Sequence, residues 1–383
     1  MSGMIYITRS DISWYSRNAN AYQKPLMLSE AFDLTLVCPE GTTVPEVIAE
    51  KCRVVKVACG EVRNGWSAMK VARFMKGAWR AVFCYSKNVQ EESGCGGERG
   101  QEPVVATGFD FPCLTLGWLA KRRRGARWIV FCWDPPALSW RDKVGVLARG
   151  VVMGVDWLFN RLVRDADRLV LNIHPGLLKE IGYAPKAGQV IQMVNGVGDW
   201  CCSMIEQGAE SHRIGIVGNA TGEKGLRLTL EAFRRLKAKV PQLMVTWIGD
   251  RPDARWMGQV PDNVEFTGRL GHEQAMERLR SCGIAIHAYL DVPSLRWNYP
   301  LKVLEYMALG KTIVAADLPG VRDLIQDGVN GLLFKPGDVN DLCRALEKAI
   351  GNQELRSRLG VQARRDAEKY RWSILNQAIG GQL

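Results

Sequence analysis

Residues 283–316 read GIAIHAYLDVPSLRWNYPLKVLEYMALGKTIVAA, and this stretch decides the fold class. Apolar runs over Gly283–Leu290 and Thr312–Ala316 predict buried strands, and Pro300–Leu309 carries apolar residues at helical spacing. Two buried strands joined through a helix are typical of a parallel βαβ unit. The stretch therefore predicts an α/β protein with parallel sheets.

Strands and helices alternate on both sides of this unit. Further strands are predicted at Ile5–Thr8, Leu34–Cys38, Val54–Val57, Ala81–Tyr85, Val104–Thr107, Trp128–Cys132, Arg168–Asn172, Arg213–Gly218 and Leu243–Gly249. Further helices are predicted at Gln23–Ala31, Ser67–Lys76, Glu273–Arg280, Asp338–Ile350 and Glu354–Tyr370. A polar stretch after a strand-like segment places a domain boundary near Met193–Ser203.

The composition of the 383 residues, 47% hydrophobic and 24% charged, is that of a globular protein and excludes disordered and collagen-like chains. No run approaches the ~18 apolar residues of a membrane span, and the first residues read as a strand rather than as a secretion signal. The 11 cysteines form no Cys-x-x-Cys pair and only four histidines accompany them, so we expect reduced thiols and no metal site.

The formal net charge of +11 is concentrated in the first half of the chain. Residues 1–192 hold 26 basic and 18 acidic side chains, with the densest cluster at Lys121–Arg124. Such an excess suits nucleic acid, anionic lipid, an anionic ligand or simply a solvated surface. The basic, amphipathic stretch from Trp140 to Arg164 is either a docking surface for anionic membrane or a buried helix with a solvated side.

The first loop that could hold phosphate is Gly218–Gly225, which reads GNATGEKG between a predicted strand and helix. Glycines let backbone N–H groups approach an anion, and Lys224 adds a cation at the start of the helix. The spacing matches neither G-x-G-x-x-G nor a Walker loop, which excludes a standard dinucleotide or P-loop site. A glycine-rich turn with a solvated lysine is the alternative interpretation.

The second such loop is Asp291–Tyr299, which leads into the helix predicted to begin at Pro300. Proline suits the first helical position, so the N–H groups of Leu301 and Lys302 point outward at the carboxyl edge of the sheet. Glu305 then lies on the helix flank, where it either accepts hydrogen bonds from ligand hydroxyls or is stabilised by the helix dipole. Gly310 is predicted to end this helix in the left-handed conformation.

Both loops follow strands of one domain, so both can open on the same crevice. Phosphate-binding groups on two sides and a hydroxyl-binding acid between them suit a nucleotide diphosphate-sugar. The sequence therefore predicts a sugar nucleotide as ligand.

Further motifs cover residues 194–350. In order along the chain they are VNGV at 194–197 followed by Asp199, the Gly218–Gly225 loop, WIGD at 247–250, VEFTGRL at 264–270, YPLKVLEYMALGK at 299–311, DLPG at 317–320 and DGVNGLL at 327–333. Together they resemble the GT-B glycosyltransferases, and specifically glycosyltransferase family 4, the retaining nucleotide-sugar enzymes. In the first half, Arg9, the Tyr15–Asn18 turn and Gln23 resemble the opening loop of such enzymes more weakly.

The resemblance implies two facing Rossmann-like domains with parallel sheets and an interdomain cleft. Residues 1–194 would form the acceptor-side domain, residues 195–365 the nucleotide-sugar domain, and residues 366–383 a helix packing back towards the first. Lys224 would neutralise the donor pyrophosphate, Glu305 would bind the ribose, and backbone groups near Arg269 would line the base. The residues implied to bind the donor are Arg17, Gly218, Asn219, Lys224, Arg269, Leu270, Tyr299, Pro300, Leu301, Lys302 and Glu305.

Two positions depart from the family. Asn219 lies near where members usually carry an arginine, and Trp297 replaces a glutamate eight residues before Glu305. Lys302 and Arg17 are the candidate replacements for the missing positive charge.

The predicted function is retaining transfer of a sugar from a nucleotide-diphosphate sugar to a glycan, lipid-linked or small-molecule acceptor in polysaccharide or glycoconjugate biosynthesis. The resemblance implies no metal and no cofactor besides the co-substrate, because lysines and helix ends neutralise the leaving diphosphate. The residues predicted to carry the catalysis are Lys224, Glu305 and Asp134, the last at the end of a strand, where it either points into the cleft or caps an Asp-Pro turn. The protein is expected in the cytoplasm, with peripheral contact to the inner face of the membrane left open.

Three alternatives remain at this point. A nucleotide-sugar epimerase or inverting transferase would use the same architecture, and a silent homologue would serve as a subunit of a complex. A nucleic-acid-binding protein would suit the charge, but the chain lacks interleaved aromatic and basic motifs, so no nucleic-acid partner is expected.

Overall fold

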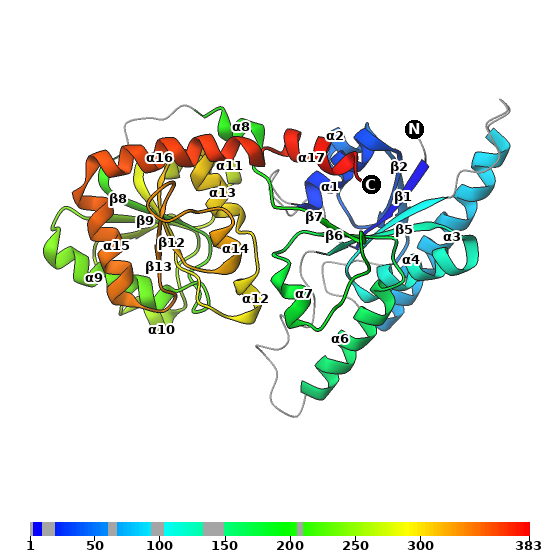
Figure 1. Cartoon of the computed structure of the whole chain (residues 1–383), viewed down its shortest axis with the longest axis horizontal. Coiled ribbons are helices and arrows are strands. Elements are labelled where there is room, and N and C mark those ends of the chain that lie inside the picture. Colours follow the sequence, from blue (N-terminus) through cyan, green and yellow to red (C-terminus); the bar gives the residue numbers. More distant parts are fainter. Residues whose placement is uncertain (1–2, 10–19, 60–66, 93–102, 133–148, 205–209) are drawn as a thin grey trace. The chain divides into compact units, whose positions relative to one another are not determined.

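The computed structural model describes residues 3–9, 20–59, 67–92, 103–132, 149–204 and 210–383 (Figure 1). The chain divides into two compact units. Unit 1 comprises Met1–Val194 and Asn376–Leu383, and unit 2 comprises Asn195–Leu375. Each unit is built on one parallel sheet, as the alternation of strands and helices predicts.

Unit 1 contains a seven-stranded sheet in the order β3-β2-β1-β4-β5-β6-β7. Its strands are β1 (Gly3–Ile7), β2 (Asp33–Pro39), β3 (Arg53–Val57), β4 (Val104–Gly108), β5 (Arg127–Cys132), β6 (Arg168–Leu171) and β7 (Val190–Gln192). Its helices are α1 (Asn20–Ala31), α2 (Glu46–Ala49), α3 (Ala68–Glu92), α4 (Phe111–Arg124), α6 (Arg149–Val163) and α7 (Gly176–Glu180). No helix of the described residues is both long and apolar enough to cross a bilayer.

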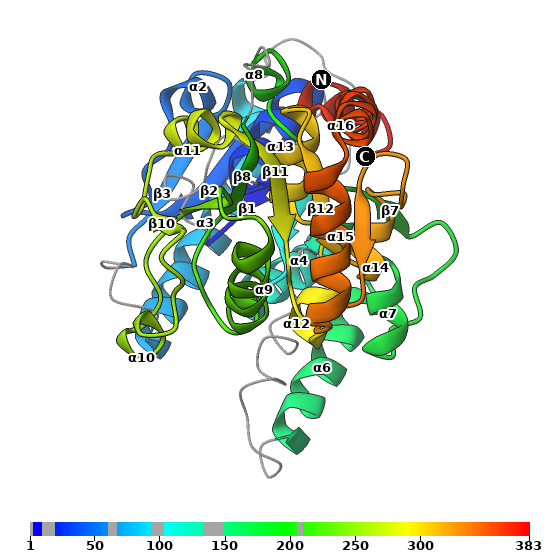
Figure 2. The ribbon, with the colours of Figure 1, turned by 90° about the vertical axis from the view of Figure 1, so that its left-hand side faces the viewer.

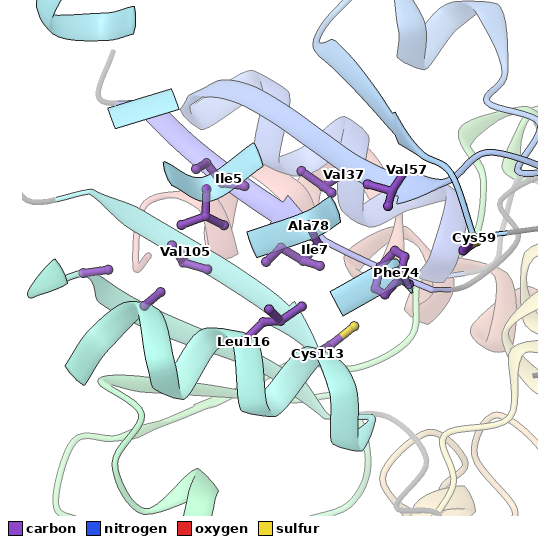
Figure 3. Packing of buried hydrophobic residues seen from close by; sticks show 13 residues of the cluster. Ile5, Ile7, Val37, Val57, Cys59, Phe74, Ala78, Val105, Cys113 and Leu116 are labelled. Atoms are coloured by element: carbon purple, nitrogen blue, oxygen red, sulfur yellow. The ribbon is translucent and has the colours of Figure 1, made fainter. Parts of the chain in front are cut away.

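The strand predicted at Ala81–Tyr85 is wrong, because these residues belong to the 25-residue helix α3. Phe74, Ala78 and Val82 repeat every four residues and are buried in one cluster with Val57 of β3 (Figure 3). This helical spacing continues into Ala81–Tyr85, whose β-branched and aromatic residues favour a strand. Burial of the helix against the sheet therefore outweighs the local preference for a strand.

Unit 2 contains a six-stranded sheet in the order β10-β9-β8-β11-β12-β13. Its strands are β8 (Glu210–Val217), β9 (Met244–Ile248), β10 (Val264–Phe266), β11 (Cys282–His287), β12 (Thr312–Ala316) and β13 (Leu332–Phe334). Its helices are α8 (Asp199–Cys202), α9 (Leu226–Lys239), α10 (Ala254–Met257), α11 (His272–Arg280), α12 (Pro293–Arg296), α13 (Leu301–Ala308), α14 (Pro319–Arg322), α15 (Val339–Gly351), α16 (Gln353–Ala367), the 3₁₀ turn η3 (Glu368–Tyr370) and α17 (Trp372–Gly380), whose last residues belong to unit 1.

The order of the strands in unit 2 reverses at β8. The chain runs outward from β8 to β9 and β10, then returns to β11 on the other side of β8. Right-handed crossovers therefore place α9 on one face of the sheet and α11 and α13 on the other. Contacts agree, because α15 packs on α9 whereas α16 packs on α13 (Figure 2). The reversal creates a switch point between β8 and β11, where ligands of doubly wound sheets bind.

The helix predicted to begin at Pro300 begins one residue later. Pro300 precedes α13 in an extended conformation, with φ −74° and ψ 115°. The proline ring fixes φ at about −65°, a value that both extended and helical backbone adopt. The proline alone therefore does not decide ψ, or whether the helix includes this residue. Gly310 ends the helix with φ +64°, which confirms its predicted left-handed role.

The first and last segments of unit 2 lie against each other. Val197 N donates to Tyr370 O at 2.9 Å, and Trp372 N donates to Val197 O at 3.0 Å. A Cβ on Gly196 would lie 2.5 Å from the buried ring of Trp372, so only glycine fits there. The segment that begins unit 2 is thus held by the end of unit 2.

The contact between Gly117 of α4 and Trp128 of β5 provides a test of packing in unit 1. A Cβ on Gly117 would lie 2.0 Å from Trp128 Nε1, which is buried and donates to Thr107 Oγ1 at 3.0 Å. We expect Gly117→Ala to lower the free energy of unfolding by about 3 kcal/mol through overpacking. Urea denaturation measures this loss in the free energy of unfolding.

Gly154→Ala in α6 is the matched control, since nothing lies within 4 Å of its Cβ position. It should raise stability by up to about 1 kcal/mol through helix propensity. Equal effects of the two substitutions would contradict the packing of α4 on β5.

Candidate functional site

Three segments of unit 2 meet at the switch point. They are the loop after β8, the loop after β11 and the first turn of α13. All three lie at the carboxyl edge of the sheet because parallel strands end at one edge. The phosphate-binding candidates Gly218, Asn219, Lys224 and Lys302 belong to these segments.

Gly218 brings the end of β8 against the side chain of Lys302. Its φ is +114°, and a Cβ there would lie 2.0 Å from Lys302 Nζ. The Gly218 carbonyl also accepts a hydrogen bond from Trp247 Nε1 at 2.8 Å. The positive φ therefore favours glycine at this position, whereas the flexible end of Lys302 can move aside.

Gly225 joins the two loops. Its φ is +78°, and a Cβ would lie 2.0 Å from the carbonyl oxygen of Ala288. Next to it, Leu290 N donates to Glu223 O at 2.9 Å. The loop that carries Lys224 is thus fixed to the loop after β11 by backbone contacts.

Lys302 is held by Tyr289. Its Nζ lies 3.3 Å from the Tyr289 hydroxyl and 5.7 Å from the centre of the same ring. Burial lowers the pKa of Lys302 to about 8, and the charge of Glu305 opposes this shift. An ammonium in this position lacks most of its hydration, which favours an anionic ligand.

His287 lies at the end of β11 and is only 2% exposed. Its ring centre is 4.0 Å from that of Tyr289, and neither ring nitrogen has a hydrogen-bond partner among the described residues. Burial above all, together with the charges of Lys302 and Lys224, lowers its pKa to about 3. The imidazole is therefore neutral at physiological pH.

A small buried space of about 10 Å³ separates these groups. Among its lining residues are Asn219, Lys224, Lys302, His287 and Tyr289. Its volume approaches that of one water molecule, and no acidic side chain lines it. The structure therefore brings both predicted lysines to one positively charged space, with Glu305 one turn along α13.

Glu305 lies one turn along α13 from Lys302. Only 5% of its surface is exposed, and its Oε1 is 2.7 Å from His272 Nε2. The His272 ring in turn contacts Trp200 edge-to-face, with ring centres 5.2 Å apart. The carboxylate is therefore positioned by a residue 33 positions earlier in the chain.

The other predicted residues fall in different places. Tyr299 is buried, its hydroxyl donates to Asp323 Oδ2 at 2.8 Å, and its carbonyl accepts from Asn195. Arg269 is exposed and pairs with Asp250 at 3.1 Å, and Leu270 next to it is half-buried. Arg17 and Asp134 lie outside the described residues.

Sequence reasoning missed His287, Tyr289 and His272. Polar aromatic residues at the end of the apolar run IAIHAYL were a usable signal for the first two, because strand ends at a switch point face ligands. His272 carried no such signal, since it is simply the first residue of α11. Among the described residues, no group of three or more His, Cys, Asp or Glu side chains could hold a metal ion.

Two buried or half-buried lysines beside a buried carboxylate can bind a ligand that carries both phosphate and hydroxyl groups. The lysines supply charge without competition from water, and the carboxylate accepts hydroxyl hydrogen bonds. Residues 206–366, which contain this site, match the family described as Glycosyl transferases group 1. This part of the chain is similar to that family.

A curated relative of this domain is the sulfoquinovosyl transferase SQD2 of Arabidopsis thaliana, 31% identical over 163 residues. That match covers 41% of this chain and 31% of the relative. The chain spans about a third of the length of such curated relatives.

Solved glycosyltransferases match both units. Sucrose-phosphate synthase from Thermosynechococcus elongatus matches 100% of this chain and 98% of its own at a TM-score of 0.72 and 16% identity. Anabaena HepE, in complex with UDP-glucose, matches 100% and 99% at a TM-score of 0.67 and 15% identity. At these identities the likeness shows the fold, which is the predicted GT-B fold of two Rossmann-like domains.

The contact between His272 and Glu305 can be tested by a double-mutant cycle. We expect His272→Ala and Glu305→Gln to be coupled by about 1–2 kcal/mol in the free energy of unfolding, because the hydrogen bond involves a buried carboxylate. Urea denaturation of the four proteins measures the coupling.

The matched control is the exposed pair Arg278 and Glu265, whose atoms lie 3.0 Å apart. A surface pair of this kind should show coupling below about 0.5 kcal/mol. A coupling energy below about 0.5 kcal/mol between His272 and Glu305 would contradict the hydrogen bond between them.

Proposed function

We propose that the protein is a retaining glycosyltransferase of family 4 that transfers a sugar from a nucleotide-diphosphate sugar. The observation that carries this proposal is the meeting of Lys224, Lys302 and Glu305 at the switch point of unit 2. The family match of residues 206–366 supports it, as does the UDP-glucose bound by HepE.

Lys224 and Lys302 stabilise the leaving diphosphate. Negative charge develops there as the anomeric carbon becomes cationic, and fixed cations in a dry site stabilise it strongly. Lys302 replaces the arginine that family members usually carry near Asn219. Its ammonium supports this role because it lies against Gly218, the residue before Asn219.

Glu305 binds the ribose hydroxyls of the donor, and His272 holds the carboxylate for that purpose. The backbone near Arg269 and Leu270 lines the base, and the amides of Leu301 and Lys302 reach phosphate or sugar. Asp134 and Arg17, which lie outside the described residues, stay predictions from the sequence. No metal or cofactor besides the sugar nucleotide takes part.

The acceptor is a glycan, a lipid-linked sugar or a small molecule, and the pathway is polysaccharide or glycoconjugate biosynthesis. Trp157 on α6 is largely exposed beside the basic Arg161. This surface supports peripheral contact with the inner face of an anionic membrane.

The site is tested by removing its charged groups one at a time. Lys224→Ala and Glu305→Ala should each lower the rate of transfer at least tenfold, about 1.4 kcal/mol or more in the activation free energy, by loss of charge stabilisation and of ribose binding. A thermal-shift panel of nucleoside diphosphates first identifies the base, and mass spectrometry of products from the best donor measures transfer.

Lys237→Ala is the control for this experiment, because Lys237 lies half-buried in the last turn of α9, at the end of the helix opposite to the Gly218–Gly225 loop. It should leave transfer unchanged. Wild-type turnover in both site variants would refute the assignment, and free epimerised sugar nucleotide formed without acceptor would favour an epimerase instead.

The lowered pKa of Lys302 predicts a pH dependence. Diphosphate binds the protonated amine, so affinity for UDP should fall as pH rises through about 8. The free protein should gain stability between pH 8 and 10.5, because there the unfolded lysine binds more protons than the buried one. Calorimetric titration of UDP from pH 7 to about 9.5 measures the affinity.

Lys302→Arg is the control, since a guanidinium keeps its charge over this range. Its UDP affinity should vary less with pH than that of the wild type. The same decline in both proteins would show that another group titrates.

A further inference from the structure

A basic groove lies in unit 1, away from the site described above. It has a volume of about 440 Å³ and runs between the end of β3 and helix α3. Four cations line it, namely Lys56 of β3 and Arg73, Lys76 and Arg80 of α3. We call the groove that these four residues line the β3–α3 groove.

The helix places its three cations together. Arg73, Lys76 and Arg80 are spaced by three and four residues, so they share one face of α3. Lys56 and Val57 alternate on β3, with Lys56 exposed and Val57 buried in the core (Figure 3). Helix and strand therefore direct positive charge to the same groove.

Close packing fixes the floor of the groove. A Cβ on Gly77 would lie 2.2 Å from Val57 Cγ1, so the backbone of α3 approaches β3 more closely than any other residue would allow. Gly77 lies between the exposed Lys76 and the buried Ala78. The cations next to Gly77 are thus attached to a rigid contact between helix and sheet.

No charge in the described structure compensates these cations. None of the four makes an ion pair or a hydrogen bond with another described residue, whereas Lys121 and Arg122 of α4 pair with Asp167 and Asp165. No acidic residue lines the groove. A groove with walls of one sign concentrates the opposite ion.

We propose that the β3–α3 groove binds a phosphate-rich anion, such as a diphosphate. Arginine and lysine are the side chains that bind phosphate best, by paired hydrogen bonds and by charge. The volume exceeds what a single phosphate fills and accommodates two linked phosphates. The β3 end of the groove lies at the carboxyl edge of the first sheet, where ligands of such sheets bind.

The test is residue-specific acetylation of lysines, read by mass spectrometry, with and without inorganic pyrophosphate. Lys56 and Lys76 should lose reactivity at least fivefold, while the exposed Lys179 of unit 1 stays unchanged. Added salt should restore reactivity because the attraction is electrostatic. Lys224 is followed in the same experiment, so failure of the donor site in unit 2 is recorded separately from failure of the groove.

Arg73→Glu/Arg80→Glu should abolish the protection of Lys56 and Lys76 and leave any protection of Lys224 intact. Arg123→Glu/Lys179→Glu is the matched control, with the same change of charge at exposed positions of unit 1 outside the groove. It should keep the protection. Circular dichroism confirms that both variants fold.

A second arm distinguishes the source of the phosphate. Flotation with phosphatidylglycerol vesicles, compared with phosphatidylcholine vesicles, tests a lipid headgroup in the groove. Binding that requires Arg73 and Arg80 would assign the groove to lipid, and protection by pyrophosphate alone would assign it to a soluble anion. Absence of both, or protection only by a single-stranded oligonucleotide, would overturn the proposal.

Discussion

The site in unit 2 depends on one steric constraint, the backbone contact between the loops that follow β8 and β11. Gly225 meets the backbone carbonyl of Ala288 at a distance that leaves no space for a Cβ, and Gly218, with a φ of +114°, turns the chain beside Lys302. Neighbouring strands of a sheet are about 4.8 Å apart, and loops with ordinary side chains would be forced apart as they leave it. The two glycines remove that obstacle, so Lys224 and Lys302 approach the same small space.

This closeness has an electrostatic consequence. The space between the loops is lined by two lysines and no acid, and burial lowers the pKa of Lys302 to about 8. His287 stays neutral beneath them, since a third charge would add both desolvation and repulsion. An anion at this point relieves the repulsion between the lysines. The fold thus holds positive charge ready before a ligand arrives, which is how preorganised sites stabilise developing negative charge.

The sequence predicted the fold well because local signals and burial agreed in most elements. Periodicity located the strands β8, β9, β11 and β12 of unit 2 and its helices α11, α13, α15 and α16, but not the short strands β10 and β13, and Gly310 located the end of α13. The prediction failed at Ala81–Tyr85, where packing on Val57 extends a helix through residues that favour a strand. The hydrogen bond between His272 and Glu305 joins residues 33 positions apart, and no local pattern encodes such a contact. Packing decides which residues surround the carboxylate of Glu305. The spacing of residues along the sequence decides where Glu305 lies on its helix.

The departure at Asn219 acquires a physical meaning in this arrangement. Family members usually carry the second cation on the loop after the first strand, whereas here Lys302 provides it from α13. Lys302 and Glu305 are three residues apart on one helix, about 4.5 Å along its axis. The proposed phosphate-binding and ribose-binding groups are therefore parts of one rigid element rather than of two mobile loops. A loop cation can adapt to donors of different shape, but a helical one fixes the spacing between charge and carboxylate. In the proposed site, this arrangement takes part of the selection of the donor from a loop to a helix.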